Sequence, residues 1–331
     1  MQIITGECIA KQLNECGIDC IFNNFQISPQ IISYYFKLKD PQKITKALKL
    51  GEVLTNWSGQ KMECANKDGF FIVTTPTPER QTINITKFKH LKKAEHYSII
   101  LGVDETGTPQ ARTIDELTHL LIAGTTGSGK SVCLNSIIIG LCCYNKPQDL
   151  GVILIDPKQV EFNIYNKLPH LITPVITETE QASNILEQLH EEMERRYFIL
   201  NSLGKEKNGG EFKKIIVVID ELADLILSNK NIKDLLIKLL QKARAAGIHF
   251  IVATQSPRAT ILNGLLLANL PSRLALTCAS TRESLLILGH KGAEKLTGKG
   301  DAILKTPQSI EEIRLQIPLI TKQQIKKLIN N

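Results

Sequence analysis

The feature that most constrains the fold is a glycine-rich loop set between an apolar strand and an apolar helix. Residues 119–124 read HLLIAG, residues 124–131 read GTTGSGKS, and residues 131–143 read SVCLNSIIIGLCC. The loop fits the pattern GxxxxGK[ST], which carries most weight when a strand precedes it and a helix follows. Glycines let the backbone wrap closely, so that successive N–H groups and the positive end of the helix face phosphate oxygens. The loop is therefore predicted to hold nucleotide phosphates.

Each part of this glycine loop (residues 124–131) has a predicted role. Lys130 is expected to contact the β- and γ-phosphates, and the Ser131 hydroxyl is expected to bind Mg²⁺. Further nucleotide contacts are expected from the rest of the loop and the first helical turn: Gly124, Thr125, Thr126, Gly127, Ser128, Gly129 and Val132. The alternative, an ordinary glycine-rich turn, is disfavoured by the strand and the helix that flank the loop.

Two acids follow the β-branched run IIVVI at residues 215–219. A doubly wound sheet places its ligands at the carboxyl ends of its strands, so Asp220 and Glu221 are expected beside the glycine loop. Asp220 is predicted to support Mg²⁺ from its outer coordination sphere, and Glu221 is predicted to polarise the attacking water, because hydrolysis needs both functions. The alternative is an ordinary strand capped by two acids.

Other residues at strand ends and in loops are candidates for the same site. Thr254 and Gln255 end the run HFIVATQ and are candidates to sense the γ-phosphate, with a satisfied turn as the alternative. Asp156 ends the run GVILID, where a cap on the following loop is the alternative. Arg244 and Arg273 are candidates for the arginine that completes hydrolysis, and each is equally compatible with a structural or solvated cation.

Strand and helix patterns alternate from residue 97 onward, which predicts an α/β fold. Continuous apolar strands separated by helices indicate a mostly parallel central sheet, buried on both faces and flanked by helices. The expected strands lie at residues 119–124, 151–156, 215–220, 249–255, 273–278 and 301–305, and the expected helices at 131–143, 177–200 and 231–247. The helix at 177–200 opens on a Thr/Glu capping pattern.

The first 96 residues read as a separate, small α+β unit. Alternation over residues 32–39 predicts a half-buried strand, and residues 41–54 show helical spacing behind a proline suited to a first turn. Two further short strands are expected at residues 61–65 and 69–75. A polar connection over residues 80–95 then leads to the larger domain, expected at 97–331.

Composition excludes several classes of protein. The 331-residue chain carries a formal charge of +7, a mild basic excess that favours a polyanionic partner without identifying one. It shows neither a signal-like start nor an apolar run near the about 18 residues of a membrane span. Reduced and mostly buried thiols, as in the cytosol, are the favoured interpretation of the eight cysteines, which form no CxxC pair.

With these residues established, the chain resembles the FtsK/SpoIIIE DNA translocases of the HerA/FtsK group. The segments that carry the resemblance, in order, are HLLIAGTTGSGKSV, IDPKQVEFNIYNKLPHLITPV, MERRY, IIVVIDELADL, QKARAAGIHFIVATQSP, LANLPSRLAL and GAEKLTGKGDAIL. The resemblance implies a RecA-like motor at 97–331 and, more weakly, an α-like subdomain before it. It also implies ATP hydrolysis with Mg²⁺ and a hexameric ring that moves along double-stranded DNA in the cytoplasm.

The resemblance also leaves points open. The chain ends in RLQIPLITKQQIKKLINN, without room for the family's winged-helix γ domain, and begins without a membrane region. A stand-alone motor for chromosome, plasmid or phage DNA is expected, which meets the duplex through phosphates. Lys158, Arg258 and Lys291 are candidates for those contacts, with plain surface charge as the alternative. The other functions considered are a conjugation-coupling or secretion ATPase, and a nucleotide-dependent DNA clamp without processive movement.

Overall fold

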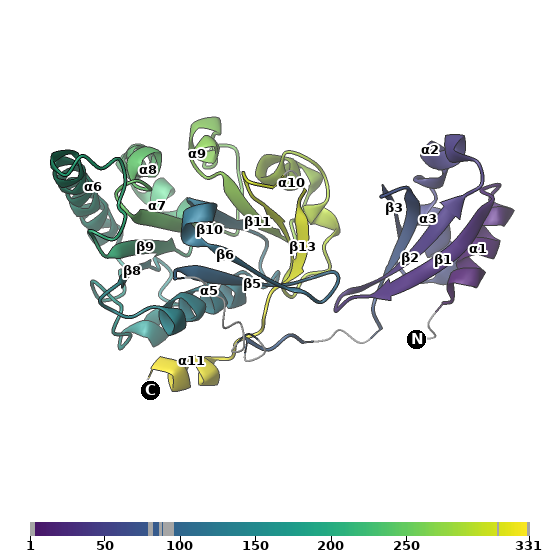
Figure 1. Ribbon diagram of the computed structural model, residues 1–331, viewed down its shortest axis with the longest axis horizontal. Coiled ribbons are helices and arrows are strands. Elements are labelled where there is room, and N and C mark those ends of the chain that lie inside the picture. The colour runs from purple at the N-terminus through teal and green to yellow at the C-terminus, as the bar shows by residue number, and fades with distance from the viewer. Residues whose placement is uncertain (1–3, 79–81, 86–87, 89–95, 310, 330–331) are drawn as a thin grey trace. The chain divides into compact units, whose positions relative to one another are not determined.

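The chain forms two compact units (Figure 1). The computed structural model describes residues 4–78, 82–85, 88, 96–309 and 311–329. One unit comprises Met1–Thr82 with Val103–Thr108, and the other comprises Ile83–Gly102 with Pro109–Asn331. Most of the predicted connection at 80–95 lies outside the described residues. The assignment of 1–96 and 97–331 as functional domains stays a prediction.

The first unit is a four-stranded antiparallel sheet with short helices, in the order β1-β2-β4-β3. Its elements are α1 (Gly6–Glu15), β1 (Cys20–Ile27), β2 (Ile31–Leu38), η1 (Pro41–Lys43), α2 (Ile44–Ala47), α3 (Gly51–Ser58), β3 (Glu63–Lys67) and β4 (Phe70–Pro76). The three strands predicted here are confirmed as β2, β3 and β4. The structure adds α1, capped by the Thr5 side chain, and β1.

The helix predicted over residues 41–54 is wrong as a single element. It is divided into η1, α2 and α3, and the break falls at residues 48–50. Leu50 turns into the core there, with 9% of its surface exposed. Gly51 then starts α3 against the Met62 carbonyl, which would lie 3.1 Å from a Cβ at this position. A continuous helix would forgo this close packing, so tertiary contacts override the local helical spacing.

The second unit is built on a mixed sheet, and the α/β fold class is confirmed. Within the described residues the sheet has nine strands in the order β6-β5-β13-β12-β11-β7-β10-β9-β8. The strands are β5 (Ser98–Asp104), β6 (Pro109–Thr113), β7 (Leu120–Ala123), β8 (Leu150–Ile155), β9 (Lys214–Ile219), β10 (Ile248–Thr254), β11 (Ser272–Leu276), β12 (Asp301–Lys305) and β13 (Ile313–Gln316). The run β8-β9-β10-β7-β11 is parallel, whereas β12 and β13 pair antiparallel.

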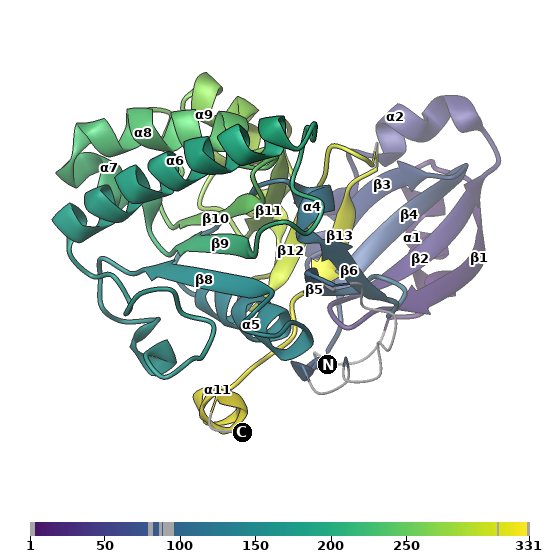
Figure 2. The same cartoon turned by 60° about the vertical axis from the view of Figure 1, so that its left-hand side comes forward.

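Helices cover both faces of this sheet (Figure 2). They are α4 (Ile114–Leu117), α5 (Lys130–Tyr144), η3 (Asn163–Tyr165), α6 (Thr179–Ser202), α7 (Leu222–Ser228), α8 (Lys230–Lys242), α9 (Gly264–Ala268), α10 (Thr281–Leu288), η4 (Ala293–Lys295) and α11 (Lys322–Ile329). Helix α5 lies on one face, and α6 and α8 lie on the other (Figures 1 and 2). No helix among the described residues combines the length and the apolarity that a membrane crossing requires.

Two apolar cores explain why the parallel strands read as continuous apolar runs. Leu120 and Ile122 of β7 pack in the core that contains α5, whereas Leu121 packs in the core that contains α6, α7 and α8. Strands β8, β9 and β10 divide their side chains between the same two cores. Burial on both faces removes the polar alternation of a surface sheet, and it leaves polar residues for the strand ends.

One predicted helix start is wrong. The Thr/Glu pattern at residues 177–180 is not a cap, because α6 begins at Thr179 after Glu178, whose side chain makes no capping hydrogen bond. The backbone around residue 176 is used differently. Ile176 bridges to Ile155 of β8 and donates its N–H to the Leu154 carbonyl at 2.9 Å, which holds the chain extended and delays the helix.

Candidate active site

The glycine loop connects the end of β7 to the start of α5 through backbone conformations that glycine allows. Gly127 has φ of +81°, and Gly129, the N-terminal cap of α5, has φ of +105°. A side chain at Gly129 would place its Cβ 2.6 Å from the Gly300 nitrogen. The left-handed conformation and the close approach therefore both require glycine at residue 129. Helix α5 begins directly after the loop, at Lys130, and the first N–H groups of a helix have no partner within it and are available to an anion.

Backbone hydrogen bonds hold the glycine loop to the chain on the β11 and β12 side. The Thr125 N–H donates to the Thr277 carbonyl at 2.9 Å, just beyond the end of β11. The Gly300 N–H donates to the Ser128 carbonyl at 2.7 Å, just before β12. The loop is thus fixed in place by residues more than 150 positions away in the sequence.

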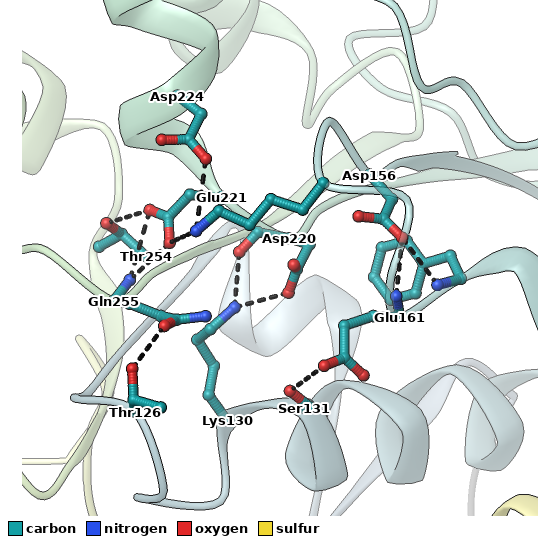
Figure 3. Close-up of polar contacts among 12 residues, drawn as sticks. Thr126, Lys130, Ser131, Asp156, Glu161, Asp220, Glu221, Asp224, Thr254 and Gln255 are labelled. Atoms are coloured by element: carbon teal, nitrogen blue, oxygen red, sulfur yellow. Dashed lines mark hydrogen bonds and ion pairs between the residues drawn. The ribbon is translucent and has the colours of Figure 1, made fainter.

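Lys130 and Asp220 meet at the centre of the site (Figure 3). The Lys130 ammonium donates to Asp220 Oδ1 at 2.5 Å and to the Asp220 carbonyl at 2.7 Å, and both side chains are almost fully buried. Burial raises the pKa of the Asp220 carboxyl; Lys130 opposes this shift, and the nearby acids Asp156 and Glu161 add to it. The site thus holds more carboxylate than its own cation neutralises.

The Ser131 hydroxyl is paired with an acid that sequence reasoning missed. It donates to Glu161 Oε1 at 2.7 Å. Glu161 comes from the loop after β8, which Asp156 folds back by accepting the Glu161 and Phe162 N–H groups on Oδ2 at 2.8 and 2.9 Å. Asp156 therefore acts as the loop cap that was the alternative to its candidate role in the site, and that cap delivers Glu161 to the site. The only sequence signal was the position of Glu161 inside a segment that resembles the family.

Glu221 is held by the end of β10 (Figure 3). Its Oε1 accepts the Thr254 hydroxyl at 2.7 Å, and its Oε2 accepts the Gln255 N–H at 3.0 Å. Gln255 in turn accepts the Thr126 hydroxyl of the glycine loop on its side-chain oxygen at 2.9 Å. A continuous set of hydrogen bonds therefore links Glu221 through Gln255 to the residues that would face phosphate.

Lys158 adds a cation to this network. Its ammonium lies 3.6 Å from Glu221 Oε2 and 3.3 Å from Asp224 Oδ2 on α7. Partial burial lowers the pKa of Lys158, but the two carboxylates more than compensate and raise it above its ordinary value. Lys158 therefore stays charged beside Glu221. The sequence offered Lys158 only as a candidate for DNA contact, and Asp224 was not singled out at all.

The donor set fits Mg²⁺ and nucleotide phosphates. Within the described residues, the buried Ser128 hydroxyl and Asp156 Oδ1 have no hydrogen-bond partner, so each retains capacity for a ligand. No three His, Cys, Asp or Glu side chains gather as a metal cluster in the described part of the chain. A site with one hydroxyl and one carboxylate suits Mg²⁺, which keeps waters and takes other ligands from substrate phosphates. Ser131 and Asp220 are the two side chains that the sequence predicts for this role.

The two candidate arginines lie away from this cluster, toward the amino ends of the parallel strands. The Arg273 guanidinium, on β11, donates to the carbonyls of Leu270, Ile287 and Leu267 at 3.3, 2.8 and 3.0 Å, and burial lowers its pKa. Arg244, in the turn before β10, is exposed and makes one bond of 3.2 Å, to the Asp115 carbonyl. The structure thus brings neither arginine to Lys130.

Three predicted residues remain: Val132, Arg258 and Lys291. Val132 is half-buried in the first turn of α5, as expected for a residue that follows the loop. Arg258 and Lys291 are exposed, as either a DNA contact or plain surface charge requires. Their side chains are not part of the polar network around Lys130 that Figure 3 shows.

Known proteins are similar to this chain in sequence. The sequence profile of the FtsK/SpoIIIE family matches residues 87–208 and 201–259. A DNA translocase FtsK of Campylobacter jejuni is 38% identical over 327 residues, which cover 92% of this chain and 34% of that protein. A DNA translocase FtsK of Staphylococcus aureus is 33% identical over 98% of this chain and 44% of its own length. The chain therefore spans less than half the length of these curated relatives.

Solved structures show the same fold at lower identity. The conjugation coupling protein TcpA of pCW3, in a monomer form with ATPγS, aligns with a TM-score of 0.67 and 22% identity over 97% of this chain and 96% of that one. The cytoplasmic domain of the Thermomonospora curvata type VII secretion ATPase EccC aligns with a TM-score of 0.68 and 21% identity over 76% of this chain and 35% of that one. Since the family profile covers more than half of its residues, the chain belongs to the FtsK/SpoIIIE family.

Proposed function

We propose that this protein is an ATPase that couples hydrolysis to the movement of double-stranded DNA. The observation that carries the proposal is the convergence of Lys130, Asp220 and Glu221 beside the glycine loop, where Lys130 Nζ lies 2.5 Å from Asp220 Oδ1. Binding a phosphate needs the loop alone, whereas hydrolysis needs the two acids as well. The family membership supports the same conclusion, and the relatives named DNA translocase indicate the polymer on which such a motor acts.

The side chains divide the work of hydrolysis among them. Lys130 would leave Asp220 for the β- and γ-phosphates. Ser131 and Asp220 would hold Mg²⁺, which would supply positive charge to the phosphates. Glu221 orients and polarises water, since it lies at the end of β9 and is fixed by Thr254. Gln255 links Glu221 to Thr126 and so reports whether the glycine loop is occupied.

Arg244 is the arginine that we propose to complete the site of a neighbouring subunit. It is exposed and makes a single hydrogen bond, whereas the Arg273 guanidinium is engaged by three carbonyls. A guanidinium held by one backbone carbonyl can turn toward a neighbour more easily than one held by three. Delivery in trans requires an oligomer, and a hexameric ring that encloses the duplex is the form that the family resemblance implies.

The cytoplasm is the proposed place of action. All eight cysteines are free thiols in the structure, four of them buried, which suits a reducing compartment. The mild excess of positive charge suits a DNA partner that is contacted mainly through phosphates. Residues 97–331 are the proposed motor, and the smaller preceding unit is the proposed counterpart of the family's α subdomain.

Triplex displacement on linear duplex DNA tests the proposal. Wild-type protein with ATP and Mg²⁺ should displace a third strand bound far from the DNA ends, and Lys130→Ala should not. Hydrolysis should also rise with duplex of any sequence, and this stimulation should fall steeply as salt rises. Lys61→Met is a matched control, because Lys61 lies in the other unit and pairs with Glu63 at 3.1 Å.

Three outcomes would count against the proposal. A hydrolysis rate indifferent to duplex would overturn DNA as the substrate and favour a coupling or secretion ATPase of the same fold. Displacement that persists in Lys130→Ala would show that the glycine loop does not drive movement. Duplex binding that depends on ATP, without displacement, would favour a clamp.

A further inference from the structure

The acid proposed to polarise water is held on both of its carboxylate oxygens by its own chain. Glu221 Oε1 accepts the Thr254 hydroxyl at 2.7 Å and the Gln255 N–H at 3.3 Å, while Oε2 accepts the same N–H at 3.0 Å and faces the Lys158 ammonium at 3.6 Å. Only 2% of the Glu221 surface is exposed. A water molecule that approaches Oε2 therefore has to compete with the Lys158 ammonium for this oxygen.

Lys158 is the partner that can leave. Thr254 and the Gln255 backbone belong to the end of β10, and their positions are fixed by the sheet. Lys158 instead comes from the loop after β8, its side chain is 42% exposed, and its distance to Glu221 is the longest of the set. It is also shared with Asp224, whose side chain is 41% exposed. Rotation of one long side chain would therefore free Oε2.

The loop that carries Lys158 is itself firmly held. Asp156 accepts two N–H groups from residues 161 and 162, and the Gln159 N–H donates to the Asp156 carbonyl at 3.1 Å. The Lys158 side chain can move while its backbone stays in place. The pair with Glu221 is partly exposed and weak, so another anion near the loop can compete for the ammonium.

We propose that Lys158 is a positioning residue that restrains Glu221 until a phosphate of duplex DNA takes its ammonium. The inference rests on the proposed function, because it names the duplex as the competing anion. In the restrained state the ammonium lies beside Oε2 and keeps water from approaching it. In the released state Oε2 faces water, while Thr254 and Gln255 still fix the carboxylate. DNA contact and hydrolysis are thereby coupled through a single side chain.

Steady-state hydrolysis with and without duplex tests this inference. The rate of the Lys130→Ala protein is subtracted as the background rate. Lys158→Met removes the charge and keeps much of the length, so the rate without DNA should rise about two- to fivefold, the factor that corresponds to a partly exposed ion pair. The rise should appear in kcat, with KM for ATP unchanged, and the stimulation by duplex should shrink. Lys158→Arg should restore both wild-type values, and Lys61→Met should resemble wild type.

The outcomes separate this inference from the proposed function. A rate without DNA that stays equal or falls in Lys158→Met would overturn the restraint, and so would an equal rise in Lys158→Arg. If wild-type hydrolysis ignores duplex, the proposed function fails, yet the comparison of rates without DNA still decides whether Lys158 restrains Glu221. A thermal unfolding midpoint equal to that of wild type ensures that the comparison concerns folded protein.

Discussion

The two edges of the parallel strands differ in how several of their charged side chains are held. At the carboxyl edge, Lys130 pairs with Asp220, and Lys158 pairs with Glu221. At the amino edge, Arg273 is engaged by backbone carbonyls, and the His249 ring bonds the Thr118 carbonyl at 2.8 Å. Pairs between side chains can be exchanged for a ligand, because the partners change without any change of fold. Bonds to backbone carbonyls cannot be exchanged so easily.

The contrast separates residues of the candidate active site from residues that stabilise the fold. Glu221 and Arg273 are both charged and both lie on strands or strand ends, but only Glu221 faces groups that a substrate would displace. Burial acts on both edges: it raises the pKa of Asp220 and lowers the pKa of Arg273. A shifted pKa therefore does not by itself mark the active edge; the kind of partner does.

The largest expected effect concerns Arg244, which is an exception to the contrast between the two edges. Arg244 lies at the amino edge, yet we assign it to the site of a neighbour. Arg244→Ala should lower hydrolysis by about 10³-fold or more, because an arginine delivered in trans has an effect of that size. The unfolding free energy should hardly change, because the residue is exposed and makes one hydrogen bond.

Mixing provides the control for Arg244→Ala. A mixture of Arg244→Ala protein and Lys130→Ala protein should recover part of the ATP hydrolysis. Some subunit contacts in the mixture pair an intact Arg244 with an intact Lys130. An absence of any recovery, with assembly intact, would argue that Arg244 acts within its own subunit or not at all.

Glu221→Gln should have the next largest effect. The amide cannot take a proton from water, so hydrolysis should fall by about 10²-fold or more. The affinity for a fluorescent ATP analogue should be retained, because Lys130 and the glycine loop are untouched. Hydrolysis at a wild-type rate would show that another group polarises water, and would remove the basis for a restraint by Lys158.

Arg273→Ala should act on stability instead. Removing the guanidinium leaves three carbonyls without this donor, so the free energy of unfolding should fall by about 2 to 4 kcal/mol. Urea denaturation measures this change. Arg273→Lys is the matched control and should recover part of the loss, because an ammonium reaches fewer of the three carbonyls. Full stability with lost hydrolysis would place Arg273 in the active site after all.

The smallest expected effect concerns Asp115 at the amino edge. The hydrogen bond with His249 holds the pKa of Asp115 below its ordinary 3.8. Burial opposes this lowering of the pKa, whereas Lys214 adds to it. The folded chain then binds fewer protons than the unfolded chain near that pH, so Asp115 stabilises the fold above pH 3.8, and the effect is lost as pH falls below it.

The measurement is the urea midpoint of wild type and Asp115→Asn at pH 7, 4 and 3. The two proteins should differ by under about 1 kcal/mol at pH 7, since the side chain is 54% exposed. The difference should shrink as pH falls. A difference that grows toward pH 3 would mean that the folded state raises the pKa of Asp115 instead of lowering it.

The centre of the site was predictable because two continuous apolar runs end there. The apolar run before Asp220 and the strand before the glycine loop both had to be buried strands, and parallel strands bring their carboxyl ends to one edge. Glu161 was not predictable in this way. It reaches Ser131 through a turn that Asp156 closes and that holds Gln159 at φ of +58°, and no periodic pattern reports such a turn.

Some of the parts of the fold that escaped prediction are short or polar. Strand β6 reads PQART and β13 reads IRLQ, and neither shows enough apolar alternation to be recognised without its partner. The sequence also left Arg244 and Arg273 equivalent. Their difference depends on carbonyls from Leu267 and Ile287, which come near Arg273 only when α9 and α10 are packed.

The contact between the glycine loop and Gly300 has a mechanical consequence. The Ser128 carbonyl is bonded to the Gly300 N–H at 2.7 Å, and the Gly300 carbonyl accepts the Ile317 N–H at 2.8 Å. This path runs from main chain to main chain, with no rotatable side chain to absorb a displacement. A shift of the loop on gaining or losing a ligand would therefore act directly on the main chain that leads into α11.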